Sequence, residues 1–343
     1  CEAALARAER MAQHLSQRWI APDQILVGLP ASELRGRAWS ISHQRPRADR
    51  AIEEQELTAL LDRGLRLAYN RLQGVGPEEP ESEDGDWLLL DATVVRLAVD
   101  DLRVTDPVGF RGHEVSATVF AALAPKEVAQ VWGQVARGLD FSSLTLAAVP
   151  LALASGLAHA EGLLVDVGAS STDVTWCKAG QPVAVESIPT GGDALTSALL
   201  NRWTLSAERA GRLKHAYAAG KLADDVNAPI LDALSPVLSG WLEEVHKTLE
   251  ALNVDEPLPE ELYLLGGGSA LPEMADALKA LAWSERLRFA RYPQVSRVKP
   301  TDVLGVVNRT ELGREPGDVP ALALAAWAAQ QSRAQDRPHR LLE

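Results

Sequence analysis

The sequence predicts an α/β fold with room for two domains, and three observations support this. The chain has 343 residues, of which 46% are hydrophobic and 24% charged, which is typical of a globular protein long enough to bury a large core. From residue 143 onward, apolar strands alternate with helical stretches, as in a sheet covered by helices. Residues 50 to 142 form a smaller pattern of helix, hairpin-like strands and helix. We therefore expect a small α+β unit set into a larger α/β protein.

Composition excludes several function classes. The 34 basic and 47 acidic side chains give a formal charge of -13, so nucleic acid would be repelled. Two cysteines and seven scattered histidines show no disulfide framework, CxxC knuckle or HExxH motif, which favours a reducing cytoplasm and argues against a zinc site. No window reaches the roughly 18 apolar residues of a membrane span.

The first half begins in a helical pattern at residues 2 to 18, followed by a buried strand at 25 to 29. A basic stretch follows, which the pattern leaves open as a solvated loop or a docking surface. Its arginines are Arg35, Arg37, Arg45, Arg47 and Arg50. Then come, in order, a helix at 52 to 72, a polar loop at 74 to 86, strands at 87 to 101, 111 to 123 and 144 to 153, and a helix at 126 to 139 between the last two strands.

The segment GLLVDVGASSTDVTW, residues 162 to 176, is a buried strand broken at Asp166 and resumed after a turn of small residues. A carboxylate in such a strand is costly unless a cation or hydrogen-bond donors meet it. Small tip residues let backbone N–H groups approach an anion, while Asp166 can hold a hydrated Mg²⁺ beside it. The pattern therefore predicts a phosphate clamp, although a plain hairpin is the alternative.

Two further glycine-bearing turns strengthen this interpretation. IPTGGDALTSALL, residues 188 to 200, places Gly191 and Gly192 before a helix that Asp193 can cap, which predicts free N–H groups at a positive helix end. LYLLGGGSALPEM, residues 262 to 274, is a buried strand, three glycines and a helix start, where backbone can lie flat against a ligand. Each is also a common simple turn, but the three together are more specific.

These motifs resemble the actin and heat-shock chaperone ATPase superfamily, and within it the FtsA family of bacterial cell division. DVGASSTD resembles the second phosphate motif, IPTGGDALT the interdomain turn, SAERAGRLKHAY the adenosine helix and LLGGGSALP the adenosine loop. TDPVGFRGHEVSATVFAA resembles the inserted subdomain of FtsA and the pilus protein PilM. The resemblance implies an actin-like ATPase fold of two lobes with an inserted small α+β subdomain.

The resemblance also implies the cofactors ATP and Mg²⁺, with Asp166 at the metal and no catalytic residue assigned. The cofactor-binding residues that it implies are Asp166, Gly168, Ala169, Ser170, Ser171, Thr172, Asp173, Gly191, Gly192, Asp193, Glu208, Lys214, Gly266, Gly267, Gly268 and Ser269. The chain departs from the family at the hairpin tip, where Ala169 and Ser170 replace glycines. If these positions need a positive φ, each substitution costs on the order of 1 kcal/mol. The family's acidic residue before the lysine falls at Ala210 or Gly211, so Glu208 is the substitute.

The domain limits implied are 1–49 for the remainder of the first lobe, 50–142 for the inserted subdomain, 143–160 for the return to the first lobe and 161–343 for the second lobe. The chain starts inside a helical pattern, so we expect that the protein's amino terminus is missing, and the family's first phosphate hairpin is not among the residues given. The tail with Arg333, Arg337 and Arg340 is short and holds Pro338, so the chain as given is expected not to bind lipid vesicles.

The function implied is a cytoplasmic scaffold that binds ATP, self-associates and links the FtsZ ring, through the FtsZ carboxyl-terminal tail, to inner-membrane division proteins at the membrane's inner face. The polar loop at 74 to 86, the helical stretch at 206 to 253 and the VTDPVG turn favour this role. The first alternative is a PilM-like component of type IV pilus or secretion machinery, and a remote one is a small-molecule kinase. Arg45 and Arg47 are candidate subunit contacts, with a solvated loop as the alternative.

Overall fold

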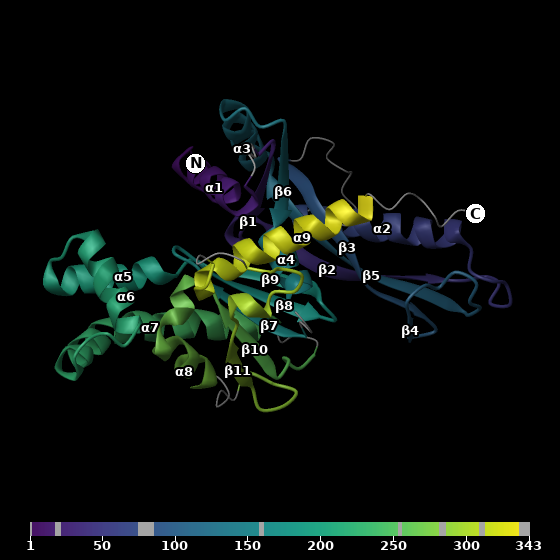
Figure 1. The fold of residues 1–343 in the computed structure, drawn as a ribbon. Helices are drawn as coiled ribbons and strands as arrows, with labels where there is room; N and C mark the ends of the chain where they lie inside the picture. Colours follow the sequence, from purple (N-terminus) through teal and green to yellow (C-terminus); the bar gives the residue numbers. More distant parts are fainter. Residues whose placement is uncertain are drawn as a thin grey trace.

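The structure, a computed structural model, describes residues 2–17, 22–74, 86–157, 161–252, 256–280, 286–308 and 313–335 (Figure 1). Most of the polar loop at 74 to 86, and Arg337 and Arg340 of the tail, lie outside the described residues. Within the described ranges, no helix combines the length and the apolar character that crossing a membrane requires.

The first half of the chain contributes two groups of elements. In order they are α1 (Glu2–Ser16), β1 (Gln24–Leu29), the short 3₁₀ helix η1 (Ala31–Glu33), β2 (Arg35–Gln44), α2 (Glu54–Gln73), β3 (Trp87–Val99), β4 (Leu102–Val104), β5 (Glu114–Pro125), α3 (Lys126–Gly138), β6 (Ser143–Ala148) and α4 (Val149–Gly156). Strands β1 and β6 pair in parallel as a separate two-stranded sheet. Helix α3 packs beside this pair through Val128 and Trp132.

The second half builds the larger α/β layer. Its elements are β7 (Gly162–Val167), β8 (Thr172–Lys178), β9 (Gln181–Ile188), α5 (Gly192–Trp203), α6 (Ala207–Ala218), α7 (Asp224–Leu252), β10 (Glu261–Leu265), the 3₁₀ helix η2 (Gly267–Ala270), α8 (Pro272–Ala280), β11 (Gln294–Arg297), the 3₁₀ helices η4 (Pro300–Asp302) and η5 (Pro316–Asp318), and α9 (Val319–Gln335). The described residues form a nine-stranded sheet in the order β11-β10-β7-β8-β9-β2-β5-β3-β4. Strands β11, β10 and β7 are parallel, and β8 and β9 return antiparallel.

Helices cover this sheet on both faces where the apolar pattern of the strands requires it. One face of β7 to β10 packs against α5, α7 and α8 around Trp241, Leu195 and Leu234. The other face packs against α4 and α9, and Leu164 and Ala323 belong to the same buried apolar cluster there. Figure 1 shows α9 running across this layer beside α4. Helix α9, which is rich in small residues, belongs to the core, because its Val319, Ala323 and Ala326 are buried.

Helix α2 covers one face of the β2-β5-β3 portion of the sheet. Its Leu60 packs with Val115, Ala117 and Val119 of β5. Strand β2 pairs with β5 along its whole length, across the proposed limit between residues 49 and 50. The division of the chain into 1–49, 50–142, 143–160 and 161–343 therefore stays a proposal, and the strand pairing joins its first two parts.

Two local predictions were wrong. The basic stretch from residue 35 was expected to be a loop, but Arg35–Gln44 is a ten-residue strand, β2. Alternating small and apolar residues between its arginines fit a strand whose neighbour supplies the hydrogen bonds. The segment 144 to 153 was expected to be one strand, but β6 ends at Ala148 and α4 begins at Val149. Pro150 in the first turn favours this helix start, because its missing N–H has no partner there in any case.

Candidate functional site

The hairpin of β7 and β8 brings two carboxylates together. Asp166 lies directly opposite Asp173 in the antiparallel register, and the turn between the strands closes with Gly168 N–H donating to Ser171 O at 2.9 Å. Ala169 and Ser170 at the tip have ordinary negative φ angles within the described backbone, so replacing the family's glycines adds no strain there. In the hydrogen bonds of the described residues, the N–H groups of Ala169 and Ser170 have no acceptor, which leaves two donors for an anion.

Asp166 is a buried carboxyl group that faces the glycine loop after β10. Burial, and to a lesser extent the charge of Asp173, raises the pKa of Asp166 to about 7. Gly266 has a φ of 82°, and a Cβ there would lie 2.2 Å from Oδ1 of Asp166 and 2.6 Å from Val167 O. Only glycine fits, because another residue would clash with the carboxylate and with backbone. The loop thus passes directly over Asp166.

The turn before α5 also joins the hairpin tip, but in a way that the sequence did not predict. Gly192 N–H donates to Gly168 O at 2.9 Å, and Asp193 N–H donates to Ala169 O at 2.8 Å. The prediction of free N–H groups at this helix end was therefore wrong for these two residues, since carbonyls of the tip accept their hydrogen bonds. The close contact explains Gly191, where a Cβ would lie 2.6 Å from Ala169 O.

Lys214 of α6 is the cation of this site. Its Nζ donates to Gly192 O at 2.7 Å, and burial lowers its pKa, although nearby Asp193 opposes that effect. Ser206 caps the helix by accepting a hydrogen bond from Arg209 N–H, which orients the turns that follow. Glu208 is exposed and forms an ion pair with Arg212, so its side chain lies outside the site.

These segments enclose a cleft of about 450 Å³, which is within the usual range for small-molecule sites. The predicted residues that line it are Asp166, Gly168, Ala169, Gly192, Asp193, Lys214, Gly266, Gly267 and Gly268. The sequence reasoning missed six others, namely His215, Ala218, Ala270, Leu271, Gly317 and Pro320. The sequence analysis did not predict that η5 would pack against η2 and form one wall, with Gly317 beside Gly267.

The remaining predicted residues do not line the cleft. They are Ser170, Ser171, Thr172, Asp173, Gly191, Glu208 and Ser269. Asp173 accepts hydrogen bonds from Ala31 N–H and from Ser187 Oγ, both at 2.7 Å, and burial is the main cause that raises its pKa. Thr172 accepts from Trp241 Nε1 at 2.9 Å and donates to Thr190 O at 2.7 Å.

Both residues therefore hold the hairpin in place from behind. Asp173 connects it to the segment after β1, and Thr172 connects it to α7. Ser269 is also structural, since its hydroxyl donates to Gly266 O at 2.7 Å and closes the glycine loop. Three glycine-bearing bends far apart in sequence thus meet in one cleft, supported by hydrogen bonds on the opposite side of the hairpin.

The chemistry of the lining fits a polyphosphate with a hydrated divalent cation. Unpaired N–H groups at the tip and the ammonium of Lys214 suit phosphate oxygens. Among the described residues no cluster of three or more acidic, His or Cys side chains could hold a metal. The two carboxylates of the lining, Asp166 and Asp193, suit Mg²⁺ bound largely through phosphates and water, but not a metal held by protein ligands alone.

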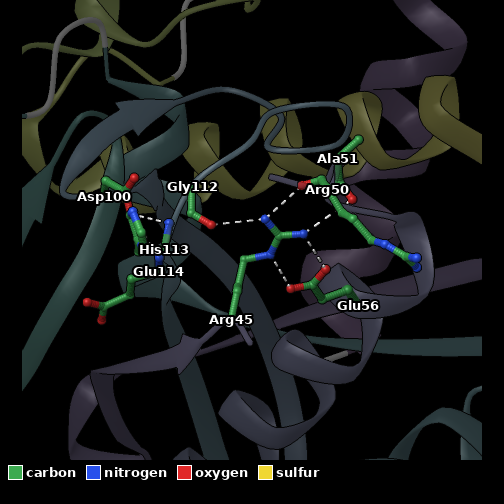
Figure 2. Close-up of polar contacts among 8 residues, drawn as sticks. All are labelled: Arg45, Arg50, Ala51, Glu56, Asp100, Gly112, His113 and Glu114. Carbon is green, nitrogen blue, oxygen red and sulfur yellow. Dashed lines mark hydrogen bonds and ion pairs between the residues drawn. The ribbon is translucent and has the colours of Figure 1, made fainter. Parts of the chain in front are cut away.

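The basic stretch is not a free surface at Arg45. Figure 2 shows its guanidinium enclosed by acceptors, and its side chain is 4% exposed. Nε and Nη2 donate to the Glu56 carboxylate at 2.7 and 3.2 Å, while the remaining bonds go to the carbonyls of Arg50, Ala51 and Gly112. The expectation of a subunit contact was wrong for Arg45, because every side of its guanidinium has an intramolecular acceptor.

The comparisons with known proteins agree with this geometry. The model of the family "Cell division protein FtsA" matches residues 163–307, which include the hairpin, the α5 turn and the glycine loop. The structure of a PilM-PilN type IV pilus biogenesis complex is similar over 94% of this chain and 85% of that one, with a TM-score of 0.60 and 21% identity. The chain therefore has a region similar to the FtsA family at residues 163–307 and shares its fold with the PilM-PilN complex structure.

Two further solved structures are similar at lower TM-scores. The ethanolamine utilization protein EutJ from Carboxydothermus hydrogenoformans is 22% identical over 57% of this chain and 60% of that one, with a TM-score of 0.41. A MamK double helical filament is 15% identical over 60% and 65%, with a TM-score of 0.44. No curated protein matches the sequence. The actin-like fold predicted from the sequence is confirmed, with the cleft at the ends of β7 and β10.

Proposed function

We propose that this FtsA- and PilM-like chain binds ATP with Mg²⁺ in the cleft and acts as a scaffold of the division machinery rather than as a fast enzyme. The single observation that carries the proposal is the meeting of the β7–β8 hairpin, the α5 turn and the glycine loop around Asp166. Such a site, made largely of glycine-rich backbone with the charged side chains of Asp166, Asp193 and Lys214, suits binding and orientation of a polyphosphate.

Each part of the cleft has a role in this proposal. The phosphates would lie against the N–H group of Ala169, the tip residue that lines the cleft. Asp166 would hold water bound to Mg²⁺, and Lys214 would face the phosphates or the sugar. The base would lie between Ala218 of α6 and Leu271 after the glycine loop, where the lining becomes apolar. Bound Mg²⁺ neutralises the phosphate charge beside the buried carboxylate.

In this scheme the ligand acts on lobe orientation. Asp173, behind the hairpin, holds the N–H of Ala31 in the first half of the chain, so an ordered hairpin also orders that contact. A ligand that prefers the arrangement with this contact formed stabilises it by the difference in its affinity for the two arrangements. Self-association would follow from the arrangement so favoured, without a need for rapid hydrolysis.

A cleft-filling variant tests the proposal. A Cβ at Gly267 would meet no atom within 4 Å, so we expect Gly267→Val to fold while its methyl groups occupy the cleft. Titration with a non-hydrolysable ATP analogue and Mg²⁺ should show affinity at least tenfold weaker than for the unchanged chain. Gly240→Val, at an open position of α7, is the matched control and should bind normally. Equal binding by both variants, or no binding by the unchanged chain at millimolar nucleotide, would overturn the proposal.

The partner separates two versions of this function. The family match over 163–307 favours a division scaffold that binds the FtsZ tail and joins it to inner-membrane division proteins. The structural match over 94% of the chain favours a PilM-like role in type IV pilus or secretion machinery, with a PilN-like partner. Immobilised FtsZ-tail and PilN amino-terminal peptides, compared on the same chain, distinguish them. Retention on the FtsZ peptide alone supports the first role, and retention on the PilN peptide alone supports the second.

A further inference from the structure

A second, larger groove lies away from the nucleotide cleft, between β2 and the β8–β9 hairpin. It encloses about 790 Å³. Its basic lining residues are Arg37, Arg71, Arg96, Arg103 and Lys178. One lining residue is acidic, Glu256, and it forms an ion pair with Lys178. In a chain with a formal charge of -13, such a concentration of positive charge marks a place that attracts anions.

The groove exists because two paired strands separate. Strand β2 pairs with β5 from Arg35 to Gln44, but with β9 only at Gly36 and Arg37. The β8–β9 ladder has an irregularity between Trp176 and Cys177, opposite the same end of β9. Such bulges bend a strand and increase its twist, which explains why β9 leaves β2 after Ala184. In the described part of the chain, no strand pairs with this side of β2 from Ala38 to Gln44.

The hydrogen-bond pattern shows which backbone groups the open edge presents. Arg45 N–H donates to His113 O at 2.7 Å, so Arg45 bonds toward β5. In an antiparallel ladder every second residue directs its backbone N–H and C=O groups to the same neighbouring strand. The residues between them direct these groups to the opposite side. The β2–β5 register has no shift, so Ala38 and Ser40 direct their N–H and C=O groups to the open edge. The same alternation directs the C=O group of Ser42 to the open edge, and the Arg63 guanidinium donates to Ser42 O at 2.7 Å.

The positive charges lie on both faces of this open edge. Arg37 is on the same face of β2 as Ile41, which packs under α2, the helix that also carries Arg71. Arg96 is aligned with Thr118, whose hydroxyl meets that of Ser40 at 2.8 Å on the opposite face. Arg103 of β4 is aligned with Ala98, two residues from Arg96, and shares that face. A strand added along β2 would therefore meet arginines on both of its faces.

We propose that this groove binds an extended acidic peptide of another protein, which adds as a strand to the open edge of β2. Backbone groups of Ala38 and Ser40 would supply the strand hydrogen bonds, and the arginines would select acidic side chains at both odd and even positions. Trp39 and Trp176 offer apolar surface for the intervening residues. Charge complementarity, and not apolar area, identifies the partner.

A defined probe tests this. The blocked peptide Glu-Val-Glu-Glu-Val-Glu-Glu-Val, labelled for fluorescence anisotropy, should bind the full chain, and its affinity should fall as salt rises. The same peptide N-methylated at alternate residues cannot form the strand hydrogen bonds and should bind at least tenfold more weakly. Hydrogen exchange should show slower exchange of the Ala38 and Ser40 amides with the first peptide only. Equal binding of both peptides, or of inorganic triphosphate at this site, would reduce the groove to a general anion patch and overturn the proposal.

Charge-reversal variants provide the matched comparison. Arg71→Glu with Arg103→Glu changes one arginine on each face, and both side chains are exposed. Loss of two attractive contacts and gain of two repulsive ones should weaken peptide binding roughly tenfold. Arg66→Glu with Arg137→Glu, exposed positions outside the groove, should change it less than twofold. Melting curves check that both variants fold.

Two outcomes of this comparison would overturn the proposal. If the groove reversal leaves binding unchanged, the arginines only keep an open edge from pairing with other strands. If sedimentation shows instead that the groove reversal dissociates an oligomer of the unchanged chain, a second copy occupies the groove. Binding of the ATP analogue is measured on the same variants and should be unchanged, which separates this groove from the cleft.

Discussion

The guanidinium of Arg45 connects the nearby start of α2 and the segment before it to the segment before β5, which is 67 residues away at Gly112. It bonds the Glu56 carboxylate of α2, the carbonyls of Arg50 and Ala51, and the carbonyl of Gly112 before β5 (Figure 2). Asp100 completes the cluster by accepting the N–H groups of His113 and Glu114, both at 2.8 Å. The local sequence shows only a basic stretch here, because the oxygen atoms that accept the hydrogen bonds of Arg45 belong to residues later in the chain.

We predict that Arg45→Ala destabilises the fold by about 3 kcal/mol. The change leaves the half-buried Glu56 carboxylate and three carbonyls without their donor, which is the costly way to break such a pair. Arg47→Ala, at an exposed neighbour, should stay within about 0.5 kcal/mol of the unchanged chain. Urea unfolding measures both. A small effect at Arg45 would show that water replaces its bonds.

Asp166 predicts a pH dependence of stability without metal or nucleotide. Its pKa in the fold is about 7, above the unfolded value of 3.8, so the folded chain holds a proton that the unfolded chain releases. Stability should therefore fall as pH rises from about 4 to 7, by up to about 4 kcal/mol, and level off above that range. Asp166→Asn should remove this component in urea unfolding with EDTA present. A variant that keeps the same slope would assign it to other groups, such as Asp173.

Among the elements, the glycine loop after β10 has a backbone conformation that only glycine can adopt at one of its positions. We predict that Gly266→Ala unfolds the region or costs about 3 kcal/mol or more, because its Cβ would meet Asp166 Oδ1 at 2.2 Å and its φ is 82°. Gly267→Ala, one residue later, meets nothing within 4 Å and should be nearly neutral. Thermal melting compares the two. Similar melting temperatures would mean that the loop relaxes freely.

The three bends could be predicted from sequence because each follows a buried strand and carries glycines, and the structure brings all three together. The contacts among the three bends could not be predicted from the sequence. The carbonyls that occupy the N–H groups of Gly192 and Asp193 come from a hairpin more than twenty residues earlier, and the wall at Gly317 comes from about fifty residues after the glycine loop. Local patterns identify a turn, but not the distant chain that packs on it.

At the scale of the molecule, Asp173 joins the two halves of the chain. Local pattern assigned it to the ligand site, yet its carboxylate accepts Ala31 N–H at 2.7 Å, 142 residues away. The arginines of β2 were likewise read as a loop, because the partner strand β5 lies about eighty residues further along. Where the residue that packs against a segment is far away in sequence, the sequence can identify the segment or the residue as important, but not what it contacts or what it does.

We predict that Asp173→Ala loosens this connection without unfolding the chain. Loss of a charge-assisted hydrogen bond should speed exchange of the Ala31 amide by at least tenfold, equivalent to roughly 1.5 kcal/mol or more. Ser187→Ala removes the other hydrogen bond to the carboxylate but leaves Ala31 its acceptor, so its exchange should change much less. Hydrogen exchange followed by mass spectrometry resolves the peptides that contain residue 31. Unchanged exchange in Asp173→Ala would mean that the contact adds nothing to the junction.

The tip of the β7–β8 hairpin offers two main-chain N–H groups that have no acceptor in the described part of the chain, at residues whose φ angles suit any L-amino acid. Chemistry carried by the backbone is insensitive to which side chain hangs from it. In a saturation library scored for nucleotide capture, positions 169 and 170 should accept most small and medium residues, whereas 191 and 266 should accept glycine almost alone. The side chains at this tip can therefore change in evolution while the backbone N–H groups that would meet a phosphate stay the same.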